Sequence, residues 1–203
     1  MAENGTLLVF TRTPVPGKTK TRLVPALGEQ GAVDLYTRFM EHTLEQAVQS
    51  NFSNLELWCT EPGNAYITGI ENSYPVRVKF QQGKNLGERM FHALYQALQY
   101  SDYAVLIGCD CPAITTEILN QSLQILQQDN AVLGPSRDGG YYLIGLRQAV
   151  PVLFENIAWG GPDVARETRN KMKVMGWAWA ETGLLQDIDT PGDLLQVADF
   201  RTG

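Results

Sequence analysis

The chain has 203 residues, of which 44% are hydrophobic and 19% charged. This length and balance predict one globular domain over residues 1–203, with a substantial buried core. The formal net charge of −6 disfavours a protein that binds nucleic acid or an anionic membrane, because either would present a basic face. We therefore expect small-molecule ligands, with no nucleic-acid or membrane partner.

The termini and the cysteines indicate the cellular compartment. No run approaches the roughly 18 consecutive apolar residues of a membrane helix, and the first residues, MAENG, lack the basic and apolar parts of a signal peptide. Three cysteines, two of them at Cys109 and Cys111, do not make a disulfide framework. Together these features predict a cytoplasmic protein with free thiols. The sequence leaves the oligomeric state open.

Strand and helix patterns alternate along the first half of the chain. Short apolar runs predict strands, and apolar residues at helical spacing predict helices. The predicted elements are a strand over 7–11, a helix over 29–50, a strand over 55–60, a short helix over 65–72, a strand over 76–81 and a helix over 85–100. The last helix begins at Asn85, because Asn85 and Glu88 have the spacing of a capping pair.

The alternation continues in the second half. The predicted elements are a strand over 103–108, a helix capped by Thr115 or Thr116, strands over 131–134 and 141–146, a helix over 164–175, extended segments over 177–180 and 184–188, and a final helix from Thr190 to about Phe200. Such a pattern predicts an α/β fold with an open, mostly parallel sheet and helices on both faces. Ligands bind such sheets at the carboxyl ends of the strands.

A basic loop follows the first predicted strand. Between Glu3 and Glu29 there is no acidic residue, yet four basic residues fall within eleven positions: Arg12, Lys18, Lys20 and Arg22. Such crowding of like charge in an acidic protein indicates an anion site. An ordinary solvated loop is an equal alternative on charge alone.

Carboxylates follow two later strands. Asp110 comes after the strand over 103–108, and the pair Asp187 and Asp189 follows a late strand. We expect these three residues and the basic loop to converge at one edge of the sheet, where cations would bind phosphates. Asp110 and Asp189 are the main candidate ligands for Mg²⁺ or Mn²⁺, and Asp187 is a third candidate ligand. The structural alternatives are a turn cap for Asp110 and a helix-terminal charge for Asp189.

Five ordered motifs resemble the DUF2064 family over nearly the whole chain. They are residues 10–23 (FTRTPVPGKTKTRL), 86–90 (LGERM), 108–112 (GCDCP), 134–135 with 138–146 (GP and DGGYYLIGL) and 187–191 (DIDTP). Members of the family are described as glycosyltransferase-like proteins, some linked to arsenosugar biosynthesis. The resemblance implies the nucleotide-diphospho-sugar transferase (GT-A) fold, with a nucleotide and metal site in a single α/β domain.

The resemblance also implies roles for individual residues. The basic loop resembles the phosphate-binding segment of nucleotidyltransferases with this fold, and Asp110 resembles their metal-binding aspartate. Asp189 lies in a segment similar to the Asp-x-Asp-Thr-Pro ending of related guanylyltransferases. Two departures concern the transferred group. Gly108 replaces the first aspartate of the glycosyltransferase Asp-x-Asp signature, and a Pro-Val-Pro-Gly-Lys loop replaces the glycine-rich loop of sugar nucleotidyltransferases.

Further candidates have two interpretations each. Asp138, beside Gly139 and Gly140, is a candidate base for an acceptor hydroxyl or simply part of a hairpin turn. Arg89 is either a nucleotide-binding residue or a surface arginine, and Trp159 is either a platform for a sugar or acceptor or a buried packing residue. Cys109 and Cys111 are interpreted as packing residues, since the two histidines have no zinc-ligand spacing.

Three functions remain open. The first is a glycosyltransferase that moves a sugar from a nucleotide-sugar to a small acceptor, with a metal that stabilises the departing diphosphate. The second is a nucleotidyltransferase that joins a nucleoside triphosphate to a phosphorylated small molecule and releases pyrophosphate. The third is a catalytically silent nucleotide-binding protein. A dinucleotide-dependent oxidoreductase is disfavoured, because no glycine fingerprint follows the first strand. We favour the glycosyltransferase on the family description.

Overall fold

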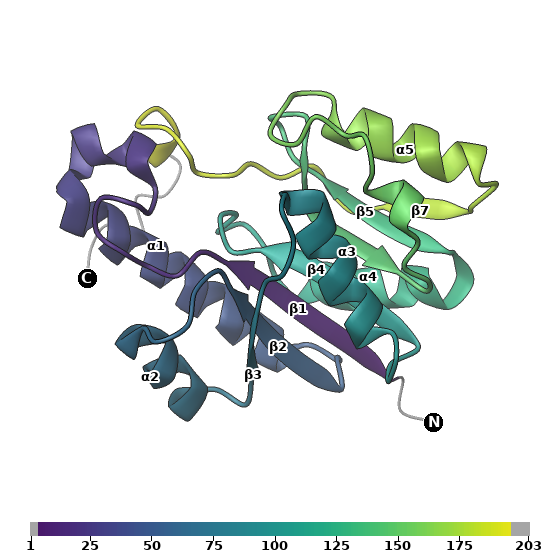
Figure 1. Ribbon diagram of the computed structural model, residues 1–203, viewed down its shortest axis with the longest axis horizontal. Helices are drawn as coiled ribbons and strands as arrows, with labels where there is room; N and C mark the ends of the chain where they lie inside the picture. Colours follow the sequence, from purple (N-terminus) through teal and green to yellow (C-terminus); the bar gives the residue numbers. More distant parts are fainter. Residues whose placement is uncertain (1–3, 196–203) are drawn as a thin grey trace.

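The computed structural model describes residues 4–195 of the chain. A seven-stranded sheet forms its centre, in the order β3-β2-β1-β4-β6-β5-β7 (Figure 1). The strands are β1 (Gly5–Thr11), β2 (Asn54–Cys59), β3 (Arg77–Phe80), β4 (Tyr103–Gly108), β5 (Ala131–Pro135), β6 (Tyr141–Leu146) and β7 (Trp179–Glu181). Only β6 runs antiparallel to its neighbours in this sheet, so the predicted mostly parallel α/β fold is confirmed.

The central strands of the sheet are mostly apolar and buried on both faces. Every residue of β1 is buried, and β4 is buried over its middle four residues. Strands that are covered on both faces read as continuous apolar runs rather than as alternating patterns. The register pairs Phe10 of β1 with Trp58 of β2 and with Gly108 of β4, so the three parallel strands end at the same edge of the sheet.

Helices cover both faces of the sheet. On one face, α1 (Val24–Gln49), α2 (Ala65–Ser73) and α4 (Thr116–Gln128) pack on a core that includes Leu7, Leu57 and Val105. On the other face, α3 (Leu86–Ala97) and α5 (Val164–Val174) pack on residues such as Leu8 and Leu106. Figure 1 shows α3 in front of the sheet and α1 behind it.

Local signals set the helix boundaries. The Asn85 side chain accepts a hydrogen bond from the Glu88 N–H at 2.9 Å, and Thr115 caps α4 in the same way through the Ile118 N–H. In α1 the helical dihedrals are interrupted at Gly28, which has φ 72°. The regular part of α1 therefore begins after Gly28, where the sequence predicts it, while one further turn precedes the break.

The segment after β7 returns across the carboxyl edge of the sheet toward α1 (Figure 1). The extended segment expected over 184–188 forms no strand of the sheet and makes only an isolated bridge between Ser136 and Leu185. It is held instead by the Ile188 N–H, which donates to the Asp110 carbonyl at 3.0 Å, and by packing of Ile188 near α1. Residues 196–200 of the helix expected from Thr190 lie outside the described residues. Within 4–195, no helix has the length and apolarity that a membrane crossing requires.

Candidate functional site

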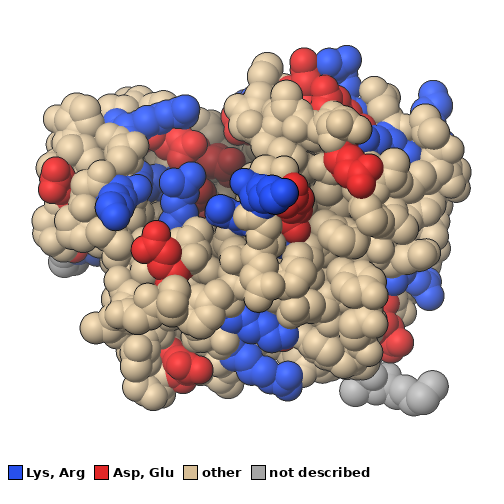
Figure 2. All heavy atoms as spheres, viewed as in Figure 1, with Lys and Arg blue, Asp and Glu red and all other residues tan. Residues whose placement is uncertain are grey.

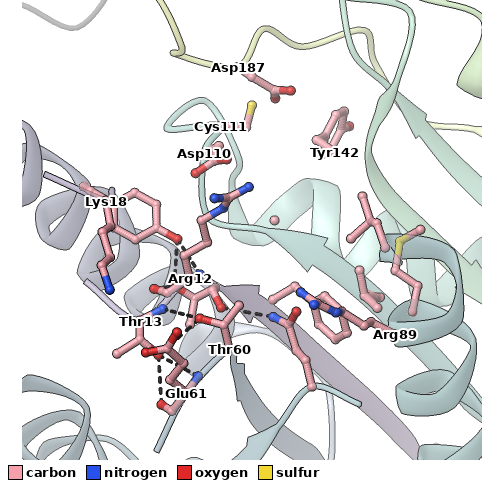
Figure 3. Close-up of a pocket in the computed structure, with 18 of the residues that line it drawn as sticks. Arg12, Thr13, Lys18, Thr60, Glu61, Arg89, Asp110, Cys111, Tyr142 and Asp187 are labelled. Carbon is pink, nitrogen blue, oxygen red and sulfur yellow. Dashed lines mark hydrogen bonds between the residues drawn. The ribbon is translucent and has the colours of Figure 1, made fainter. Parts of the chain in front are cut away.

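A cavity of about 740 Å³ lies at the carboxyl edge of β1, β2 and β4. Charged side chains of both signs gather around the hollow on the face shown in Figure 2. Figure 3 shows Asp110, Cys111 and Asp187 at one end of the cavity and Thr60 and Glu61 at the other. The loops after separate strands thus build one shared cavity.

Three cationic residues line the cavity: Arg12, Lys18 and Arg89. Arg12 follows β1 directly, and its N–H donates to the Tyr36 hydroxyl of α1 at 2.9 Å. The next residue, Thr13, donates through its N–H to the Thr60 hydroxyl at 3.0 Å. These bonds tie the start of the basic loop to α1 and to the end of β2. Arg12 and Lys18 are exposed, so both can reach an anion in the cavity.

Lys20 is oriented differently from Lys18. Its ammonium Nζ lies 2.6 Å from Asp189 Oδ1 and 3.2 Å from Asp110 Oδ1, and its side chain is only 6% exposed. Burial lowers the pKa of Lys20, but the charges of Asp110 and Asp189 outweigh that effect and raise the pKa above its ordinary value. The basic loop and the two carboxylates therefore meet as the sequence predicts, although Lys20 binds carboxylates in this structure.

The acidic end of the cavity carries more negative charge than Lys20 offsets. Burial, followed by the charges of Asp110, Asp138 and Asp189, raises the pKa of Asp187 to about 7. Asp110 Oδ1 is buried and has no hydrogen-bond partner among residues 4–195, since its contact with Lys20 lacks hydrogen-bond geometry. Clustered carboxylates raise one another's pKa when no sufficient cation is near. This end of the cavity therefore attracts a cation.

The donor set fits a hard divalent ion. Asp110 and Asp187 both line the cavity and offer only oxygen atoms, which Mg²⁺ and Mn²⁺ prefer. Within residues 4–195, no group of three or more His, Cys, Asp or Glu side chains is arranged to bind a metal. Mg²⁺ commonly uses one or two carboxylates and takes its remaining ligands from water and phosphate. The residues present fit an ion whose remaining ligands are water or phosphate oxygens.

Several predicted residues lie outside the cavity lining. Arg22 is exposed. Asp138 is also exposed, and its carboxylate accepts hydrogen bonds from the Gly140 N–H at 2.9 Å and from the Ser136 hydroxyl, as in the turn interpretation. Asp189 is half-buried against Lys20. The structure thus brings Arg12, Lys18, Arg89, Asp110 and Asp187 to the cavity wall.

Trp159 packs against neighbouring elements. A Cβ atom on Gly87 would lie 2.5 Å from the Trp159 Nε1, so the indole sits directly on the start of α3. Its ring meets Tyr141 edge to face, with 6.4 Å between the ring centroids. Tyr141, in turn, lines the cavity. Trp159 therefore supports a wall of the cavity from behind.

Other lining residues were not singled out from the sequence. Gln81 follows β3, and its amide nitrogen donates to the carbonyls of Thr11 and Trp58 at 3.0 and 2.9 Å. Its carbonyl oxygen remains as an acceptor in a fixed position. Glu61 follows β2 in the same way. The rule that applied to Asp110, a polar residue after a strand end, would have found both.

The cysteines are free and buried. Cys109 lies beneath the site and donates to the Tyr36 hydroxyl at 3.1 Å. Burial raises the pKa of each of Cys59, Cys109 and Cys111 to about 12, so the reactive thiolate is disfavoured at neutral pH.

Comparison with known proteins shows the family to which the sequence belongs. The profile of DUF2064, described as uncharacterized proteins conserved in bacteria, matches residues 43–161, more than half of the chain. The chain belongs to the DUF2064 family. A crystal structure of a candidate nucleotide-diphospho-sugar transferase from Desulfovibrio desulfuricans G20 is 31% identical, with a TM-score of 0.85, over 99% of this chain and 91% of that one. No curated protein matches the sequence.

More distant structures share the fold alone. The 4-diphosphocytidyl-2C-methyl-D-erythritol synthase of Anaerococcus prevotii DSM 20548 is 11% identical, with a TM-score of 0.66 over 100% of this chain and 97% of that one. A manganese complex of Rv0371C from Mycobacterium tuberculosis H37Rv is 15% identical, with a TM-score of 0.57 over 98% and 100% of the chains. This DUF2064 chain therefore has the fold of nucleotide-diphospho-sugar transferases and nucleotidyltransferases.

The DUF2064 match covers only part of the candidate site. The matched residues 43–161 include Arg89, Asp110 and Asp138, whereas the basic loop and residues 187–189 lie outside them. The similarity to the D. desulfuricans protein extends over 99% of the chain and so takes in those parts as well.

Proposed function

We propose that this DUF2064 protein is a nucleotide-sugar-dependent glycosyltransferase that uses Mg²⁺ or Mn²⁺ and transfers a sugar to a small acceptor. One observation carries the proposal. A single cavity has cationic side chains, Arg12 and Lys18, on its wall together with the carboxylates Asp110 and Asp187. A nucleotide diphosphate with a divalent ion matches this distribution of charge. The similarity to the D. desulfuricans protein supports the same class of substrate.

The chain's own residues would act mainly by binding and orientation. Arg12 and Lys18 would hold diphosphate oxygens through charge-assisted hydrogen bonds. Asp110 and Asp187 would hold the divalent ion, which would stabilise the negative charge on the departing diphosphate. The acceptor hydroxyl oxygen bonds to the anomeric carbon of the sugar, the bond from that carbon to the diphosphate breaks, and the hydroxyl proton passes to water.

The remaining wall of the cavity would receive the less polar parts of the substrates. Phe10, Met90, Leu106 and Tyr141 line it from β1, α3, β4 and β6. Apolar and aromatic side chains exclude water and favour a sugar or base ring over bulk solvent. Trp159 holds the Tyr141 ring in place from behind.

A second function is favoured by a separate observation. Arg89 lines the same cavity as Arg12 and Lys18, and three cations are more than a diphosphate needs. A nucleoside triphosphate would use them all. In that case a phosphorylated substrate would attack the α-phosphate and pyrophosphate would leave.

The released product separates the two functions. The protein is incubated with Mn²⁺ and each nucleotide-sugar, and separately with each nucleoside triphosphate together with sugar phosphates. Slow release of nucleoside diphosphate, abolished in Asp110→Asn, is expected for the glycosyltransferase. Release of pyrophosphate instead would replace our proposal with the nucleotidyltransferase. If neither product forms while nucleotide still binds, a silent nucleotide-binding protein becomes the better account.

Binding measurements test the phosphate contacts. Lys18→Gln and Arg12→Gln should each weaken the affinity for a nucleoside diphosphate with Mn²⁺ by about 1–3 kcal/mol, since each removes a charge-assisted contact. Arg22→Gln is the matched control, because it removes a charge from the same loop outside the cavity lining. Equal losses in all three variants would show that the loop acts only through its overall charge.

A further inference from the structure

Lys20 lies at the junction of the two loops that carry the predicted metal ligands. Its ammonium contacts Asp189 Oδ1 at 2.6 Å and Asp110 Oδ1 at 3.2 Å. These loops are also joined through the backbone, because the Ile188 N–H donates to the Asp110 carbonyl. The side chain is 6% exposed, whereas those of Asp110 and Asp189 are 45% and 47% exposed. The cation is thus the buried member of the cluster.

The backbone holds Lys20 in this place. Lys20 adopts a left-handed conformation, with φ 47° and ψ 46°, which is uncommon for a residue other than glycine. Its carbonyl accepts a hydrogen bond from the Leu23 N–H at 2.8 Å, and the Leu23 side chain is fully buried in the cluster around α1 and Ile188. The backbone at Lys20 is held by these contacts, and the burial of the side chain with its two carboxylate contacts keeps the ammonium away from the cavity wall.

A divalent ion in the same place would be repelled. Asp110 and Asp189 would be the obvious pair of metal ligands, but a fixed positive charge between two carboxylates disfavours a second cation there. Asp187 lies at the same acidic end, lines the cavity and makes no ion pair with Lys20. Asp110 and Asp187 both line the cavity, whereas Lys20 is absent from its lining, so an ion held by these two carboxylates from the cavity side would not need the position of the ammonium.

We propose that Lys20 is a built-in cation of this carboxylate cluster, which restricts the site to one divalent ion bound by Asp110 and Asp187. Asp189 then serves as the partner that positions Lys20 and is not itself a metal ligand. The proposal rests on the metal dependence in the proposed function. Beyond that function, it states that one divalent ion binds and that Lys20 prevents a second from binding. Lys20 acts on the ion by charge and does not bind phosphate.

The test measures Mn²⁺ binding to the whole protein without nucleotide, from the electron paramagnetic resonance signal of the free ion. We expect the native chain to bind at most one Mn²⁺. Lys20→Met should bind the first ion about tenfold more tightly or take up a second, because a repelling charge is gone. Arg22→Met, which removes a charge from the same loop, should match the native chain. Unchanged binding in Lys20→Met, including no binding by either protein, would overturn the proposal.

Two further variants decide the question if Lys20→Met does not fold. Asp189→Asn should still bind one Mn²⁺, whereas Asp187→Asn should bind it at least about tenfold more weakly than Asp189→Asn does. Loss of binding in Asp189→Asn alone would make Asp189 a ligand and refute the assignment. Because the measurement needs no turnover, a protein that binds Mn²⁺ as described but releases no product would overturn the proposed function and leave this inference standing.

Discussion

Replacing Asp187 with asparagine should stabilise the metal-free protein at alkaline pH and have less effect in acid. The folded protein raises the pKa of this carboxyl from 3.8 to about 7, through burial and through the charges of Asp110, Asp138 and Asp189. A raised pKa means that Asp187 favours the folded state most below pH about 4, and that this contribution is lost as the pH rises through 7. At pH 8 the native chain therefore bears the full cost of an ionised Asp187.

The size of the effect follows from the shift. At 1.36 kcal/mol for each pKa unit, the ionised carboxylate costs at most about 4 kcal/mol at pH 8. Of that cost, about 2.5 kcal/mol develops between pH 5 and pH 8. Asparagine has nearly the same shape and no charge, so the variant escapes this loss. We expect its advantage over the native chain to grow by about 1–2.5 kcal/mol across this range, since relaxation and water reduce the upper limit.

Urea unfolding at pH 5 and pH 8 in the presence of a chelator measures the difference. Asp102→Asn is the matched control, because Asp102 is exposed and precedes β4 at the other end of the strand. Its effect on the free energy of unfolding should be the same at both pH values. An advantage of Asp187→Asn that stays constant or shrinks from pH 5 to pH 8 would refute the electrostatic account of the acidic cluster.

Three other variants test the packing around Trp159 and the buried charge of Glu56. Gly87→Ala places a Cβ atom 2.5 Å from Trp159 Nε1 and should destabilise the fold by about 1–3 kcal/mol in urea unfolding. Gly69→Ala in α2 meets nothing within 4 Å and should stabilise the fold by about 0.5–1 kcal/mol, so equal effects would contradict the packing argument. Lys79→Met leaves the fully buried Glu56, now 2.7 Å from the Lys79 Nζ, without its cation, and we expect a loss of about 2–3 kcal/mol. A loss below about 0.5 kcal/mol would show that the Trp58 and Tyr100 hydrogen bonds suffice for that carboxylate.

The fold could be predicted because its main signals are local. The run over residues 103–108 matches β4 at both ends, and the Asn85 cap places the start of α3. Local signals do not show how the late extended segment is held. Within residues 184–188, Ile188 is covered by α1 and bonded to the Asp110 carbonyl, not paired with a neighbouring strand, while Leu184 is 54% exposed. Distant packing of that kind leaves no periodic trace in the sequence.

The candidate site could be predicted only in part, from the strand-end rule that ligand-binding residues follow the carboxyl ends of parallel strands. That rule places Arg12, Lys18, Asp110 and Asp187 at one edge, and the structure has them around one cavity. It cannot tell Lys18 from Lys20, which are two residues apart and chemically identical. Lys20 has a left-handed backbone and lies close to Leu23, which packs with α1 and with Ile188, and contacts between segments so far apart cannot be read from the sequence.

The different positions of Lys18 and Lys20 can be explained by the charges around the cavity. Three carboxylates, Asp110, Asp187 and Asp189, would repel a diphosphate brought to the same cavity. One ammonium and one divalent ion together would balance those three charges. Arg12 and Lys18 would then remain available to offset the charge of the diphosphate itself. In this loop the buried Lys20 would offset charge in the acidic cluster, while the exposed Lys18 would bind the anionic ligand. A loop whose cations were all exposed would leave the acidic cluster without a fixed positive charge.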